Sequence, residues 1–97
     1  MSDFKVGDRV FWESSYTEKI GTVIEVVKPG SPPQTHKTVE SRFAREKQSY
    51  VIGDVRMKKY LYKQNITAFT PVKGTCWPHA SLLRLAREGE GGGYGDE

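Results

Sequence analysis

The sequence contains little that could brace a fold covalently or hold it in a membrane. Its 97 residues include one cysteine, Cys76, so an internal disulfide is excluded. No run of about 18 apolar residues occurs, as a membrane-spanning helix would require. The opening residues M-S-D-F-K also lack the apolar segment of a signal peptide. We therefore expect a cytoplasmic protein without membrane contact.

Groups for catalysis or metal binding are also scarce. Cys76 and His79 have a C-x-x-H spacing, and His36 is the other histidine. Two ligands do not close a zinc site, and a nucleophile also needs an orienting group and an oxyanion donor. We therefore expect no enzyme activity, no catalytic residue, no metal and no cofactor.

What the chain does have is an uneven distribution of charge. The net charge is +3, but residues 88–97 contain four acids and no base, so residues 1–87 carry 15 bases against 8 acids. Within residues 37–63, eight bases face three acids. The eight bases are Lys37, Arg42, Arg45, Lys47, Arg56, Lys58, Lys59 and Lys63. A patch of one sign can attract a polyanion, although a charge run can also be simply a solvated surface.

The length allows one small domain with a modest core. We expect a short N-terminal lead over residues 1–5 and a folded domain over residues 6–87. Residues 28–48 begin with three prolines and a glycine and read as a long exposed loop, with at most a short helix near its end. Residues 88–97 are acidic and rich in glycine, which predicts a disordered tail.

Short runs of β-branched and aromatic residues predict an all-β domain. Residues 6–12 and 20–27 read as an antiparallel pair joined by a polar loop over residues 13–19, and Ile20, Ile24 and Val26 are expected on one face. Further strands are expected at 49–55, 58–62 and 66–72, with a bulge or bend at Gly53. A tight helical turn near residues 79–81 then leads into a last short strand.

Two segments carry a resemblance to a known fold. Val6-Gly7-Asp8-Arg9-Val10, followed by residues 21–26, resembles the opening of KOW and Tudor-type SH3-like barrels, where a G-D-x-V strand precedes a G-x-V strand. Residues 77–83, W-P-H-A-S-L-L, are similar to the helical turn that feeds the closing strand of such barrels. The resemblance implies a small SH3-like antiparallel barrel of five to six strands. Barrels of this kind bind RNA, DNA, components of nucleic-acid machinery, methylated side chains or proline-rich peptides.

Charge and fold together favour a monomeric, non-enzymatic module that binds nucleic acid, either DNA or RNA, or a protein of nucleic-acid machinery. Cations neutralise phosphates while aromatic faces stack on unpaired bases, and Phe43, Tyr50, Tyr60 and Tyr62 interleave with the bases. The candidate contact residues are Arg42, Arg45, Lys47, Arg56, Lys58, Lys59, Tyr60, Tyr62 and Lys63.

Other interpretations stay open. Trp12, Tyr16 and Trp77 could form an aromatic cage for a methylated cation, although a core role is the stronger prediction for both tryptophans. The chain could instead be a protein-binding adaptor or a small inhibitor, of the kind that a phage or mobile element encodes, whose basic face docks on an acidic protein surface. A purely structural subunit of a larger particle would show itself by an apolar patch that needs a neighbour.

Overall fold

In a computed structural model, the chain forms a five-stranded antiparallel sheet in the order β4-β3-β2-β1-β5. The structure describes residues 3–14, 17–39, 43–59 and 69–87. The strands are β1 (Arg9–Ser14), β2 (Thr17–Val27), β3 (Ser49–Lys59), β4 (Thr70–Pro71) and β5 (Arg84–Leu85), and a 3-10 turn, η2 (Ala80–Leu82), precedes β5. The all-β prediction is therefore confirmed, and none of the described residues form a helix that could cross a membrane.

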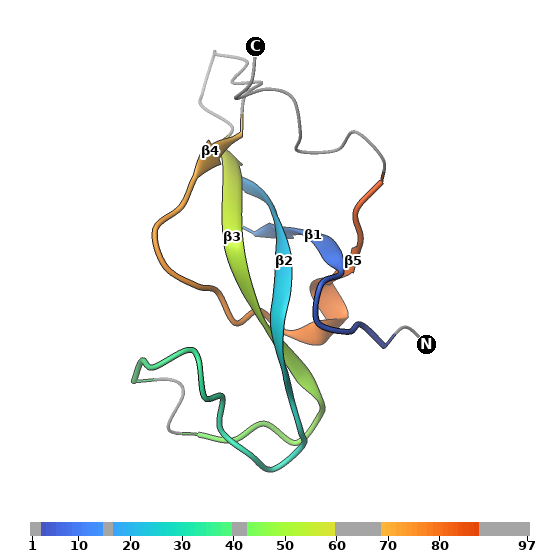
Figure 1. The fold of residues 1–97 in the computed structure, drawn as a ribbon, viewed down its shortest axis with the longest axis vertical. Helices are drawn as coiled ribbons and strands as arrows, with labels where there is room; N and C mark the ends of the chain where they lie inside the picture. Colours follow the sequence, from blue (N-terminus) through green and yellow to red (C-terminus); the bar gives the residue numbers. More distant parts are fainter. Residues whose placement is uncertain (1–2, 15–16, 40–42, 60–68, 88–97) are drawn as a thin grey trace.

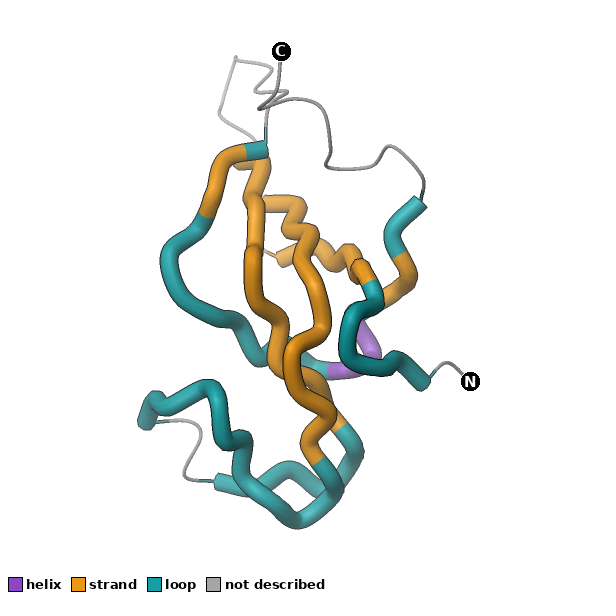
Figure 2. Tube along the Cα trace, viewed as in Figure 1, coloured by secondary structure: helices purple, strands orange, loops and turns teal. Residues whose placement is uncertain are grey.

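The long strands β2 and β3 form the centre of the molecule, with the loop of residues 28–48 at one end and β4 at the other (Figure 1). Figure 2 shows η2 in purple, at the point where the chain returns to lie beside β1. The turn is one residue later than predicted, at residues 80–82. After this turn the chain forms β5, which pairs with β1 so that Leu85 lies opposite Val10.

The strand boundaries correct two predictions. The expected polar loop over residues 13–19 is mostly strand, because β1 continues to Ser14 and β2 starts at Thr17. The sequence predicts separate strands at 49–55 and 58–62. The structure joins the first to the start of the second, because β3 runs unbroken from Ser49 to Lys59. The polar composition of these residues does not predict a strand. Antiparallel pairing with the long β2 supplies the backbone hydrogen bonds that keep them extended.

Two bulges bend the β2–β3 pair. Asp54 has a φ of 49° and is the extra residue on β3 opposite Gly21, which confirms the bulge predicted beside Gly53. The second register shift lies at Ile24 on β2. The bulge at Ile24 reverses the alternation of side chains along β2, so Ile20, Ile24 and Val26 do not share one face as predicted. Ile20 and Val26 pack into different core clusters, and Ile24 is 39% exposed.

Apolar side chains are buried on both faces of the sheet. The main cluster joins residues from the segment before β1, from β1, β2 and β3, and from the residue between η2 and β5: Phe4, Val10, Trp12, Val23, Tyr50, Ile52, Val55 and Leu83. A smaller cluster of Phe11, Ile20 and Phe69 includes the residues that pair across β1 and β2 on the opposite face. A third contains Val27, Val51 and Trp77. The core roles predicted for Trp12 and Trp77 are confirmed.

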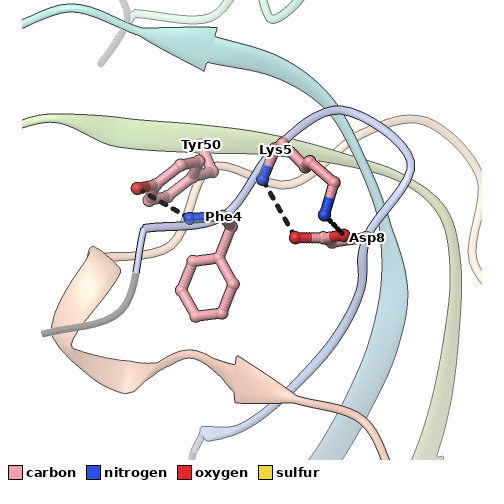
Figure 3. Close-up of polar contacts among 4 residues, drawn as sticks. All are labelled: Phe4, Lys5, Asp8 and Tyr50. Atoms are coloured by element: carbon pink, nitrogen blue, oxygen red, sulfur yellow. Dashed lines mark hydrogen bonds and ion pairs between the residues drawn. The ribbon is translucent and has the colours of Figure 1, made fainter.

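The segment just before β1 belongs to the folded unit. Phe4 is buried, its ring meets that of Tyr50 edge-on at 5.2 Å, and its amide donates to the Tyr50 hydroxyl at 3.2 Å (Figure 3). Lys5 closes a turn with Asp8, whose carboxylate accepts from both the amide and the ammonium group of Lys5. The lead predicted over residues 1–5 is therefore integral to the domain from Phe4 onward.

Candidate nucleic-acid interface

The structure divides the basic segment that the sequence predicted as one surface. Arg45 and Lys47 precede β3, whereas Arg56, Lys58 and Lys59 lie at its far end. A strand of this length spans roughly 30 Å, because each residue advances about 3.3 Å. The predicted contacts at Arg42, Tyr60, Tyr62 and Lys63 lie outside the described residues. The described bases therefore form two separate groups.

The group at the far end of β3 is partly engaged within the protein. The Nζ of Lys58 lies 3.3 Å from a carboxylate oxygen of Glu18, its cross-strand neighbour, and 5.6 Å from the centre of the Phe69 ring. Both side chains of the ion pair are mostly shielded, at 21% and 16% exposed. Arg56 is half-buried beside Ile20 and Pro71. Lys58 therefore stabilises this end of the sheet, which sequence alone did not indicate.

Arg45 also has an internal role. Its guanidinium lies 3.8 Å from the centre of the Trp77 ring and donates to the backbone carbonyls of Trp77 at 2.8 Å and Pro78 at 3.0 Å. Trp77 in turn donates from Nε1 to the hydroxyl of buried Ser49 at 2.9 Å. This stack joins the end of the long loop to the segment before η2.

A hollow of about 390 Å³ lies beside this stack. Residues 45–49 form one wall and residues 79–81 form the other. Lys47 and His79 are exposed on its two sides, and Glu46 is the acid among the lining residues. Arg45 and Lys47 are thus the two predicted contact residues that the structure brings to one concave surface.

The loop of residues 28–48 is tied down at several points. Pro33 is fully buried, His36 shares a hydrogen bond of 2.7 Å with the hydroxyl of Thr75, and the amide of Gly30 donates to the carbonyl of Arg45 at 2.8 Å. The carboxylate of Glu25 on β2 accepts from two backbone amides, those of residues 34 and 35, and from the Thr35 hydroxyl. The loop is therefore an anchored insertion, and its described parts contain no helix.

The Glu25 contacts predict an acid-sensitive attachment of the insertion. Burial raises the pKa of Glu25, but the hydrogen bonds from Thr35 and the two amides, together with the charge of Lys37, outweigh it and hold the pKa below 4.5. Because the pKa is lower in the folded state, this stability is present above pH 4.5 and is lost as the pH falls through the folded-state value.

We therefore expect Glu25→Gln to lower the free energy of unfolding at pH 6 more than at pH 3. Urea denaturation of both proteins at the two pH values measures this difference. A difference in the free energy of unfolding that is the same at pH 3 as at pH 6 would contradict a stabilising role for the ionised carboxylate of Glu25.

The two tryptophans of the suggested cage are not gathered at one site. Trp12 is 3% exposed and belongs to the main cluster, while Trp77 is 6% exposed and packs with Val27 and Val51. Tyr16 lies outside the described residues. The two tryptophans that can be placed therefore contribute to separate parts of the core.

Cys76 and His79 also have no further metal-ligating partner in the described parts of the chain, where no group of three or more His, Cys, Asp or Glu residues is arranged to hold a metal ion. Burial raises the pKa of the Cys76 thiol, and the charge of Lys19 only partly opposes this effect. Because the thiolate is the reactive form of cysteine, a raised pKa disfavours Cys76 as a nucleophile.

Comparison with known proteins adds no relative from which a role could be transferred: no family model, curated protein sequence or solved structure matches the chain.

Proposed function

We propose that the protein is a non-enzymatic binding module that engages nucleic acid, or a protein of nucleic-acid machinery, through the hollow beside Arg45 and Lys47. The observation that carries this proposal is the placement of both bases on one concave surface. The excess of bases over acids in residues 1–87 supports attraction of a polyanion from a distance. Lys47 is exposed and positioned to meet a phosphate, while Arg45 sets the shape of the wall.

We further propose that the sheet is that of an SH3-like barrel of KOW or Tudor type. Three features support this assignment: the bulges that bend β2 and β3, the 3-10 turn directly before the last strand, and the pairing of that strand with β1. A bent antiparallel sheet whose last strand returns to the first is the arrangement that the resemblance implies. The proposed fold class is compatible with binding and does not by itself choose the partner.

The test of the binding surface is reversal of one charge. We expect Lys47→Glu to weaken binding of a fluorescein-labelled oligonucleotide by roughly tenfold at low salt, and to reduce the slope of log affinity against log salt by about one. Fluorescence anisotropy with single-stranded DNA, duplex DNA and RNA, at low and near-physiological salt, measures both quantities. Lys58 is a poorer choice, because its reversal would place a second carboxylate beside Glu18.

Lys73→Glu is the matched control, since it makes the same charge change at an exposed position that does not line the hollow. Equal effects of the two reversals would show that binding depends on the net charge of the protein and not on the hollow. Loss of all binding at modest salt would favour the protein-partner interpretation, in which the basic face docks on an acidic protein surface.

A further inference from the structure

Phe43 differs from every other described aromatic residue. Its side chain is 70% exposed. The other described phenylalanine, tyrosine and tryptophan residues are buried: Phe4, Phe11, Trp12, Tyr50, Phe69 and Trp77. A phenyl ring exposed to water lacks the favourable free energy of burial that the other described rings have. The exposed ring is therefore a candidate contact.

The position of Phe43 is set by the anchored insertion. Two residues further on, Arg45 is stacked on Trp77 and bonded to two backbone carbonyls, and its own carbonyl accepts from Gly30. The backbone next to Phe43 is thus tied to the core. Such preorganisation lowers the entropic cost of binding through the ring.

The surroundings of Phe43 favour a polyanion. Exposed Lys37 and Lys47 lie on the same insertion, and Lys47 also lines the hollow that begins at Arg45. Phe43 precedes Arg45, the first residue that lines this hollow, by two positions. Aromatic rings and cations together bind single strands, because phosphates contact the cations while unpaired bases stack on the ring. In a duplex the bases are already stacked on one another, so they cannot take the same position without unpairing.

We propose that Phe43 is a stacking platform for an unpaired base, and that the nucleic acid held beside Arg45 and Lys47 is single-stranded. This inference rests on the proposed function and narrows it to one class of substrate. Lys47 meets the phosphates of the strand and Phe43 holds a base, so the insertion supplies both parts of the contact.

The test compares Phe43→Leu with the unaltered protein on two probes, a labelled single-stranded 12-mer and the same sequence as a duplex. Leucine keeps an exposed apolar side chain and removes the aromatic face. We expect about tenfold weaker binding of the single strand, a change equivalent to about 1.4 kcal/mol, and unchanged binding of the duplex. In Phe43→Trp we expect retained affinity and quenching of the added indole emission by the single strand.

Val39→Ala serves as the control, because Val39 is 69% exposed on the same insertion but has no aromatic face. Equal losses from Phe43→Leu and Val39→Ala, or equal losses on both probes, would overturn stacking and leave the proposed function intact. Unchanged binding of the single strand by Phe43→Leu would do the same. If the unaltered protein binds neither probe, the nucleic-acid part of the proposed function fails, and the stacking role of Phe43 fails with it.

Discussion

Replacing Gly21 with alanine is expected to destabilise this protein more than any other single methyl addition at a described glycine. A Cβ at Gly21 would clash with Cγ2 of Ile52 and would lie 2.9 Å from the carbonyl oxygen of Gly53. The second contact is with backbone in the paired strand β3, which cannot move without disturbing the bulge at Asp54. Overpacking a core typically costs 1–3 kcal/mol, and we expect about 3 kcal/mol here.

Urea denaturation of Gly21→Ala measures the loss. Gly53→Ala is the matched control, since the atoms nearest its Cβ would belong to the side chain of Ile24, at 3.1 Å and beyond, and Ile24 is partly exposed and free to shift. We expect this control to lose no more than about 1 kcal/mol. Equal stability of the two variants would show that β2 and β3 do not approach as closely at Gly21 as the structure indicates.

The second large effect is expected at Arg45. Arg45→Lys keeps the positive charge but removes the planar group that stacks on Trp77 and donates to two carbonyls at once. Hydrogen bonds from charged donors contribute about 1.5–3 kcal/mol when shielded, and Arg45 is only half-buried. We therefore expect a loss of about 2 kcal/mol in the free energy of unfolding.

The same substitution should release the insertion from the segment before η2. Hydrogen exchange of the amide of Gly30, which donates to the carbonyl of Arg45, reports this release directly. Lys47→Ala is the control, because Lys47 is exposed and should change the stability by less than about 0.5 kcal/mol. An Arg45→Lys variant as stable as the unaltered protein would mean that Arg45 is held by charge alone.

The candidate site was only partly predictable. Charge counts indicated Arg45, Lys47, Arg56 and Lys58 as a group of cations, and all four are at or near the surface. They could not indicate that Arg45 stacks on a tryptophan 32 residues further along the chain. Nor could they indicate that Lys58 on β3 forms an ion pair with Glu18 on the neighbouring strand β2. Such contacts join residues that are distant in sequence, so no local pattern reports them.

Local chemistry in the sequence by itself determined the all-β class, the core roles of Trp12 and Trp77, the bulge beside Gly53 and the helical turn before the last strand. These features depend on side-chain size, β-branching and backbone freedom, which each residue carries with it. The tertiary structure alone decided the strand lengths, the different faces of Ile20 and Val26, and the separation of the basic residues along β3. Pairing between distant strands shifts the register at each bulge, and a shift of one residue moves a side chain to the opposite face.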